Sequence, residues 1–300
     1  MRNRMVFPVR LAIVAGAFSI SVSAQPPAAA PFTAHQLKPN VYWIEGGGGN
    51  SGVIVGDKGV IVVDAKTTAA GGKELLDDIA KITPKPVTTV ILTHSDGDHV
   101  NGLAAFPAGI TIIAHENNKK EQQAALTAGG RGAPPADHLP TRVVTKNKET
   151  LKINGVKVEV LHWAPAHTSG DLVVYLPADK IVFTGDIFAM QLPDPLIHLE
   201  KNGSSEGWIA TAKGMVALNA VQYVPGHGDV QMKPAIQKRL ADAEAKRAKI
   251  KDLVAQGKTL EEIKVAVGDP PPAQGRGGRG GPGFASFTEV VYRELTKKSA

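Results

Sequence analysis

The sequence contains no cysteine, and this absence excludes several kinds of structure. A chain without cysteine forms no disulfide, binds no metal through thiolate and carries no lipid on an N-terminal cysteine. Such a protein depends on its hydrophobic core or on bound metal for stability. Any metal site must then use imidazole and carboxylate groups as its strong ligands.

The N-terminus has no apolar run long enough to span a bilayer. Residues 11–20 are largely apolar, but they supply only about half of the roughly 20 residues that a spanning helix needs. Three arginines lie before this run, and Ser21-Val22-Ser23-Ala24 follows it. This pattern is typical of a secretory signal. We therefore predict a signal peptide over residues 1–24, a periplasmic or secreted protein, and no stable membrane anchor after cleavage.

A strong net charge is also missing. The formal charge of the full chain is +6, and removal of Arg2, Arg4 and Arg10 with the signal lowers it to +3. This excess is too small to indicate nucleic-acid binding. We expect a small-molecule substrate and no nucleic-acid partner. With 300 residues and 43% apolar content, the chain can bury one large core or two small ones.

Apolar strands alternate with amphipathic helices between residues 40 and 268. Residues 87–92 predict a buried strand, residues 72–82 an amphipathic helix and residues 234–256 a long one. Residues 99–106 predict the start of another helix. Two successive groups of strands followed by helices favour sheets in the middle with helices outside.

The segments on either side of this region differ from it in composition. Residues 25–39 are rich in Pro and Ala and predict a flexible mature N-terminus. Residues 269–283 are rich in Gly, Pro and Arg, which indicates a disordered loop. Residues 284–300 carry enough apolar residues to form a C-terminal helix that docks back on the protein.

Metal-ligand residue types cluster directly after the predicted strand at 87–92. Two imidazoles and two carboxylates stand within six positions, at His94, Asp96, Asp98 and His99. Histidine and aspartate are ligands for zinc and for harder divalent ions. Three further residues of these types lie beside later apolar strands, namely His167, Asp186 and His227. Together they suggest a two-metal hydrolase.

The order of these motifs resembles that of the metallo-β-lactamase superfamily over residues 40–268. The first motif of that family, His-x-His-x-Asp-His, stands here as His94-Ser95-Asp96-Gly97-Asp98-His99. The later motifs stand as Ala166-His167-Thr168-Ser169-Gly170, Thr184-Gly185-Asp186 and Pro225-Gly226-His227-Gly228. Each is weak alone, but all four in order form a strong signal. The resemblance implies an α/β fold, the αβ/βα four-layer sandwich of two mixed sheets flanked by helices.

The resemblance also implies a ligand set and a chemistry. One ion would take His94, Asp96 and His167, the second would take Asp98, His99 and His227, and Asp186 would bridge both. The implied cofactor is a pair of divalent ions, with zinc as the first expectation. A metal-bound hydroxide would be the nucleophile, and Asp98 would be the catalytic residue that orients it.

The first motif departs from the family at Asp96, where a second histidine is usual. A third carboxylate makes the first ion a weaker Lewis acid and favours a harder metal such as manganese or iron. Aspartate is also shorter than histidine. Two alternatives follow: both ions bind, or only the second site is filled. Metal analysis of the purified protein separates them.

The resemblance leaves the substrate open. The first expectation is an exported metal-dependent hydrolase of an ester-, lactone- or lactam-type bond, β-lactamase-like. One alternative is a glyoxalase II-like thioester hydrolase, whose basic pocket would come from the predicted long helix, although a solvated helix face is the simpler interpretation. The basic residues concerned are Lys233, Lys238, Arg239, Lys246 and Arg247. A second alternative is a non-catalytic metal-binding relative in which Asp96 disables the first ion.

Other polar residues have two interpretations each. Asp64 ends a predicted strand and is either a hydrogen-bond partner of a ligand histidine or a plain turn residue. Residues 191–205 either line the substrate cleft or simply connect two elements. The remaining histidines have no motif around them, so we expect solvated or structural roles for His35, His115, His138, His162 and His198.

Overall fold

The computed structural model describes residues 31–129, 136–269 and 284–297. The predicted signal peptide at 1–24 lies outside the described residues. So do residues 25–30 and nearly all of the predicted Gly/Pro/Arg-rich loop. None of the helices in the described ranges combines the length and the apolar character that crossing a membrane requires.

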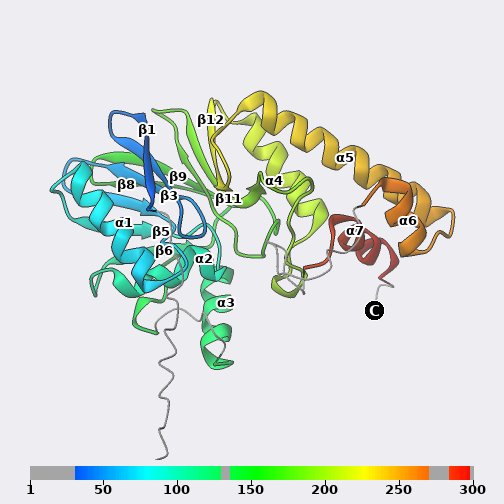
Figure 1. Ribbon diagram of the computed structural model, residues 1–300, viewed down its shortest axis with the longest axis horizontal. Coiled ribbons are helices and arrows are strands. Elements are labelled where there is room, and N and C mark those ends of the chain that lie inside the picture. The colour runs from blue at the N-terminus through cyan, green and yellow to red at the C-terminus, as the bar shows by residue number, and fades with distance from the viewer. Residues whose placement is uncertain (1–30, 130–135, 270–283, 298–300) are drawn as a thin grey trace, which may run out of the picture. The chain divides into compact units, whose positions relative to one another are not determined.

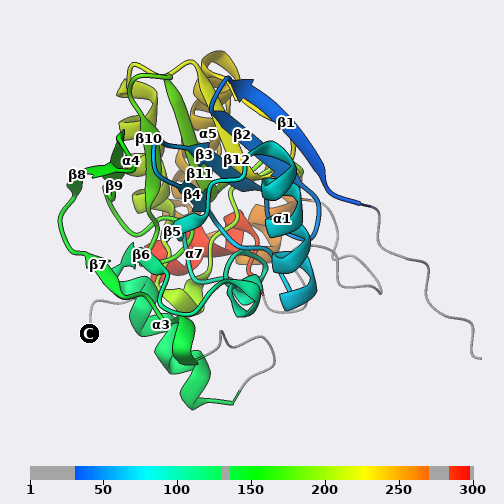
Figure 2. The same cartoon turned by 90° about the vertical axis from the view of Figure 1, so that its left-hand side faces the viewer.

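Two mixed sheets lie at the centre (Figures 1 and 2). The first has seven strands in chain order: β1 (Thr33–Lys38), β2 (Val41–Glu45), β3 (Ser51–Val55), β4 (Val60–Val63), β5 (Val87–Ile91), β6 (Thr111–His115) and β7 (Arg142–Val144). The second has six strands in the order β13-β12-β11-β10-β9-β8: β8 (Lys148–Ile153), β9 (Val156–Leu161), β10 (Val173–Leu176), β11 (Ile181–Ala189), β12 (Gln222–His227) and β13 (Gln231–Met232). Parallel pairing runs from β4 to β7 and joins β11 to β12.

Helices cover the outer face of each sheet (Figure 1). The described α-helices are α1 (Ala69–Ile82), α2 (Gly97–Val100), α3 (Glu116–Thr127), α4 (Ser205–Ala217), α5 (Lys233–Ala255), α6 (Leu260–Val267) and α7 (Phe287–Thr296). Short 3₁₀ turns are η1 (Asn101–Ala105), η2 (Ala136–His138) and η3 (Leu199–Lys201).

Three hydrophobic clusters hold these layers together. One lies between the sheets and contains Ile61 of β4 and Phe183 of β11. A second joins the first sheet to α1 through Leu75 and Ile79, the buried side of the predicted amphipathic helix. The third joins the second sheet to α4, α5, α6 and α7. Because strands covered on both faces are apolar throughout, β4 is buried at every position. The predicted four-layer sandwich is therefore confirmed.

Two local predictions were wrong. The flexible N-terminus predicted over 25–39 contains β1, which pairs antiparallel with β2. This edge strand is stabilised by its backbone pairing and by the His35 ring stacked on Trp43, with ring centroids 4.4 Å apart. The helix predicted over 99–106 is only the short α2 followed by η1. The backbone passes close to Ala65 in η1, since a Cβ on Gly102 would lie 1.7 Å from the carbonyl oxygen of Ala65.

Candidate metal centre

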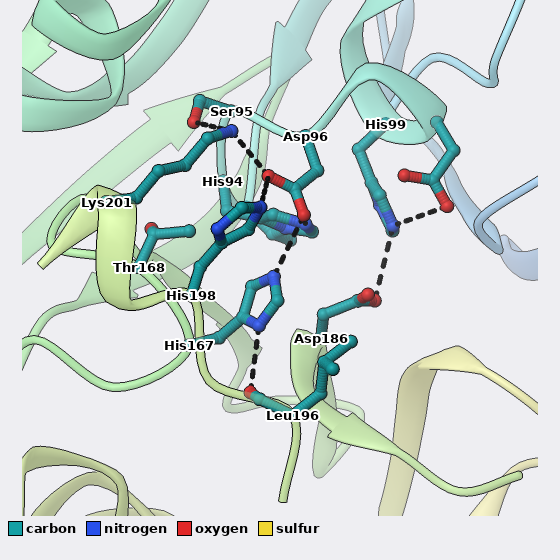
Figure 3. A network of polar contacts seen from close by, with 12 residues as sticks. His94, Ser95, Asp96, His99, His167, Thr168, Asp186, Leu196, His198 and Lys201 are labelled. Atoms are coloured by element: carbon teal, nitrogen blue, oxygen red, sulfur yellow. Dashed lines mark hydrogen bonds and ion pairs between the residues drawn. The ribbon is translucent and has the colours of Figure 1, made fainter. Parts of the chain in front are cut away.

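The seven predicted ligand residues come together near the ends of strands from both sheets. Figure 3 shows His94, Asp96, His99, His167 and Asp186 among them. The first motif follows β5 and continues into α2, so its side chains are spread over a loop and the first turn of a short helix. His167 follows β9, whereas Asp186 and His227 lie on the neighbouring parallel strands β11 and β12.

The first half of the centre contains His94, Asp96 and His167. The Oδ2 atom of Asp96 lies 3.1 Å from Nε2 of His167 and 3.8 Å from Nε2 of His94. The shorter aspartate side chain therefore reaches both imidazoles. His94 and His167 are fully buried, with rings in edge contact at a centroid distance of 4.7 Å.

The second half contains Asp98, His99 and His227. The Oδ2 atom of Asp98 lies 3.0 Å from Nε2 of His227 and 3.8 Å from Nε2 of His99. Asp186 stands between these imidazoles, with Oδ1 3.2 Å from Nε2 of His99 and Oδ2 3.4 Å from Nε2 of His227. Asp186 also has an oxygen within 4.8 Å of ligand atoms of His94 and His167, so its carboxylate contacts both halves.

Hydrogen bonds on the far side of three imidazoles aim Nε2 into the centre. Asp64 Oδ2 contacts Nδ1 of His99 at 2.8 Å, and the Leu196 carbonyl contacts Nδ1 of His167 at 2.9 Å. Nδ1 of His94 lies 3.0 Å from the hydroxyl of Thr93, which also bonds Asp64 at 2.6 Å. Contacts of this kind fix the tautomer and ring orientation of metal ligands. Asp64 is thus the partner of a ligand-type histidine rather than a plain turn residue.

The centre contains buried polar atoms without partners, as expected for a site that holds a cation. Nε2 of His94, Nε2 of His99 and Oδ1 of Asp186 are buried and lack a hydrogen-bond partner. Buried polar atoms without partners are costly and rare in native proteins. A donor set of four imidazoles and three carboxylates suits zinc, manganese or iron. The residues present therefore fit a pair of divalent ions.

The pKa values within this cluster depend on both burial and charge. Burial lowers the pKa of His94 well below its usual range, and neighbouring His99 adds to that shift. Burial also acts to lower the pKa of His99, but the carboxylates of Asp186 and Asp64 raise it well above its usual range. For Asp186, burial alone would raise the pKa, and His99 and His227 hold it well below. The carboxylates are thus ionised and make the centre attractive to cations.

Two glycines allow backbone to pass close to these side chains. A Cβ on Gly226 would lie 1.9 Å from Oδ1 of Asp186, and a Cβ on Gly49 would lie 2.2 Å from the ring of His99. The loop after β2 and the end of β12 thus lie against the centre. The glycine run at 46–49 is a visible feature of the sequence, but its contact with His99 had no signal in the pattern.

A pocket of about 370 Å³ opens onto the centre. The pocket is lined by the candidate ligand residues Asp96, Asp98, Asp186 and His227, by the apolar Ala189, Leu192, Leu196 and Phe284, and by Gly97, Gln191, His198 and Lys201. Five of these belong to the segment 191–205, so that segment lines the cleft.

His198 and Lys201 were missed by the sequence reasoning. His198 precedes the 3₁₀ turn η3, and Lys201 is its last residue. A bond from the His198 amide to the His167 carbonyl at 2.8 Å ties this turn to the His167 loop. The ring of His198 packs on Phe284 with centroids 4.3 Å apart, and Nε2 lies 3.8 Å from Oδ1 of Asp96. Lys201 forms an ion pair with the same oxygen.

The other histidines without motifs lie in different surroundings. His115 and His162 stack on each other with centroids 4.1 Å apart, and His138 bonds the carbonyl of Phe106. The stacked rings are not among the described groups that could hold a metal. For these residues the structure supports the expected structural role.

The basic residues of α5 have partners within the protein. Arg239 donates to the backbone carbonyls of Leu192, Pro193 and Asp194 and so fixes the wall of the pocket. The remaining four bond as follows: Lys233 to the Leu218 carbonyl, Lys238 to Asp242, Lys246 to Asp194 and Asp269, and Arg247 to Ser205 and Glu206. This arrangement favours a structural role over a basic substrate pocket.

The sequence profile of the metallo-beta-lactamase superfamily matches residues 44–227, more than half of the chain and all seven ligand-type residues. The chain belongs to this superfamily. Its two mixed sheets with helices on both outer faces are the metallo-β-lactamase fold, as the sequence motifs predicted.

Members of the superfamily similar to this chain carry different names. The 2,4-dinitroanisole O-demethylase subunit alpha of Nocardioides sp. (strain JS1661) is 28% identical over 199 residues, which cover 65% of this chain and 57% of the relative. The metallo-beta-lactamase type 2 of Bacillus sp. (strain 170) is 29% identical over 188 residues, which cover 60% of this chain and 67% of the relative.

A solved structure shows the same fold. The stereoselective inverting sec-alkylsulfatase Pisa1 from Pseudomonas sp. matches with a TM-score of 0.65 at 19% identity, over 88% of this chain and 50% of the sulfatase. This chain thus spans about half of the sulfatase and 57% of the demethylase subunit. The superfamily assignment leaves the substrate to be argued from the site.

Proposed function

We propose that the protein is a metal-dependent hydrolase that cleaves an ester-, lactone- or lactam-type bond. The observation that carries this proposal is the convergence of four imidazoles and three carboxylates at the floor of a pocket, with buried Nε2 and Oδ1 atoms that have no partner. The stacked pair His115 and His162, by contrast, does not belong to any group of described residues that could hold a metal.

In this proposal His94, Asp96 and His167 hold one divalent ion, Asp98, His99 and His227 hold the other, and Asp186 contributes to both. Bound divalent ions of this type polarise the substrate and lower the pKa of water, so that hydrolysis proceeds near neutral pH. Zinc is the first expectation, and the third carboxylate supports manganese or iron as well.

Asp98 is the best candidate for direct contact with the attacking water. Its side chain is 34% exposed, whereas those of Asp96 and Asp186 are 13% and 4% exposed. Burial acts to raise the pKa of Asp98, but the hydrogen bond with His227 and the charge of His99 lower it overall. An ionised carboxylate at the pocket surface can orient the water and accept its proton.

The pocket supports a substrate with an apolar body and no obligatory negative charge. Ala189, Leu192, Leu196 and Phe284 form an apolar wall beside the catalytic floor. Among the described lining residues Lys201 is the only Lys or Arg, and its ammonium is already engaged by Asp96 and Ser95. We therefore rank a neutral ester or lactone above a β-lactam, whose carboxylate would find no unengaged Lys or Arg side chain among the described lining residues. A thioester with an anionic carrier ranks lower still.

A hydrolysis panel tests the function. The protein is freed of metal, reloaded with zinc or manganese, and assayed with a neutral aryl ester, a lactone, a chromogenic cephalosporin and a lactoyl thioester. We expect turnover that chelation abolishes, that is highest on a neutral ester or lactone, and that Asp98→Asn nearly eliminates. Glu149→Gln, an acid-to-amide change on strand β8, is the matched control and should retain activity.

The panel also tests the alternatives. Turnover that survives both chelation and Asp98→Asn would overturn the hydrolase proposal. Metal binding without turnover on any substrate class would support the non-catalytic relative. Preference for the lactoyl thioester would support the glyoxalase II-like alternative.

We further propose export of the protein, on the basis of residues 1–24 of the sequence. Expression of the full chain followed by mass spectrometry of the periplasmic fraction tests this. The expected product begins at Gln25, and a full-length chain retained in the cytoplasm would contradict it.

A further inference from the structure

Asp96 uses its two oxygens for different purposes (Figure 3). Oδ2 faces His167 and His94, as a ligand atom would, whereas Oδ1 accepts from the ammonium of Lys201. Among the described residues, Asp96 is the only acid within ion-pair distance of Lys201. The additional carboxylate of the first motif therefore comes with a cation that is in direct contact with it.

A chain of hydrogen bonds fixes Lys201 in this place. Its ammonium also donates to the hydroxyl of Ser95 at 2.9 Å, and that hydroxyl donates to Glu121 at 2.6 Å. The other oxygen of Glu121 accepts from Ser169 at 2.8 Å, and the amide of Ser169 donates to the carbonyl of Lys201 at 2.7 Å. The lysine is thus anchored at both ends, and its side chain is only 25% exposed.

The charges show what this contact achieves. A histidine at position 96 would bring a neutral ligand, and the centre would hold the two carboxylates of Asp98 and Asp186. The aspartate adds one negative charge, and Lys201 adds one positive charge beside it. As a unit, Asp96 and Lys201 carry no net charge, as a neutral imidazole does. The total charge of the centre is then the same as it would be with the superfamily's usual histidine at position 96.

We infer that Lys201 is the charge partner of Asp96, and that the two side chains together replace the second histidine of the first motif. The inference rests on the metal centre of the proposed function. It explains how the first half of the centre keeps a usable ligand although the motif departs from the family. It also assigns Lys201 a role that a solvated lysine or a substrate-binding lysine would not have.

The pair predicts opposite effects for the two single substitutions. In Asp96→His, Lys201 loses its counter-charge and faces a dication across a neutral ring, so electrostatic repulsion weakens binding of the first-half ion. In Lys201→Met, the carboxylate is no longer neutralised, so a divalent ion binds at least as tightly and the preference moves from zinc toward manganese. In the double variant both charges are absent, and zinc binding returns toward that of the unmodified protein.

The experiment is a double-mutant cycle of metal affinity by calorimetric titration of metal-free protein with zinc and with manganese. We expect Asp96→His to lower first-half zinc affinity by about tenfold or more, the size of effect typical of residues that support a ligand. Adding Lys201→Met should recover most of that loss. Lys201→Arg keeps the charge and should resemble the unmodified protein, and Lys238→Met, which removes an exposed lysine of α5, should change nothing.

The outcomes separate the two proposals. If the unmodified protein binds no divalent ion, the proposed metal centre fails. If it binds metal but the double variant is as weak as Asp96→His or weaker, the charge pairing is wrong. Should Asp96→His not fold, as judged by circular dichroism, Lys201→Met still decides, since a loss of affinity or an unchanged manganese-to-zinc ratio overturns the inference.

Discussion

The two halves of the metal centre are supported by opposite charges. In the second half the anion of Asp64 bonds the imidazole of His99, whereas in the first half the cation of Lys201 bonds the carboxylate of Asp96. Asp64 adds a negative charge to the second half. In the first half the positive charge of Lys201 offsets the negative charge of Asp96, so their sum is zero. The comparison teaches that the charge of a site follows from its ligands together with the groups behind them. We therefore expect the second half to bind its ion first and more tightly.

The largest effect should come from the residue that the halves share. Asp186→Ala removes the carboxylate that contacts His99 and His227 and also lies near His94 and His167. Affinity for both ions should fall by more than about a hundredfold, beyond the range for an outer supporting residue. Titration with zinc followed by elemental analysis measures this, and retention of one tightly bound ion would contradict the shared role.

The next test removes one imidazole from each half. His227→Ala should abolish tight binding in the second half, whereas His167→Ala should leave that ion in place. Elemental analysis at one equivalent of zinc is the measurement. We expect nearly full occupancy for His167→Ala and a large loss for His227→Ala. Equal losses would mean that the two halves do not differ in affinity.

Replacing the supporting anion should have a smaller effect. Asp64→Asn keeps the shape of the side chain but removes the charge behind His99, and its carboxylate also accepts from the amide of Thr93 at 2.8 Å. Second-half affinity should fall by about ten- to a hundredfold. Competition with a fluorescent zinc chelator reports this change, and Glu149→Gln, on strand β8, serves as the control.

The smallest effect concerns the stacked pair His115 and His162 outside the centre. Burial, with His162 next to it, lowers the pKa of His115 to about 4. Between about pH 6.5 and pH 4 the unfolded chain therefore binds a proton that the folded chain does not, and stability falls as the pH falls through that range. His115→Asn keeps an acceptor at the start of α3 and should remove roughly 1–2 kcal/mol of this loss between pH 7 and pH 5.

Urea unfolding of both proteins at the two pH values measures the difference. Metal content should be unchanged in His115→Asn, because His115 does not belong to the metal centre. The substitution therefore shows the effect of removing a histidine that has no carboxylate partner. Identical pH dependence of the two proteins would show that His115 titrates normally.

The convergence of the proposed ligands could be predicted from the sequence because most of them follow or lie on an apolar strand. His94 and His99 follow the end of β5, and Asp186 and His227 lie on β11 and β12, so the strand pattern brings them close together. The same local logic predicted the amphipathic α1. Sequence analysis thus predicted those features whose structure depends on residues adjacent in the chain.

The contacts it missed join distant segments. Lys201 meets Asp96 across 105 positions, from a short 3₁₀ turn with no periodic pattern. His198 reaches the pocket from the same turn. Strand β1 was mistaken for a flexible segment because its stability comes from pairing with β2 rather than from its own composition. No local pattern encodes such partners, so only the folded chain reveals them.

Arg239 on helix α5 donates to the carbonyls of residues 192–194, which form part of the pocket wall. Helix α5 therefore helps to shape the pocket although it carries none of the candidate ligand residues. Because Arg239 of α5 holds the backbone beside Leu192, substitutions on α5 can change the shape of the apolar pocket wall while the candidate ligand residues stay the same. If residues 192–194 were exchanged for the corresponding segment of a relative, Leu192 would keep its place only if an arginine were also present at position 239.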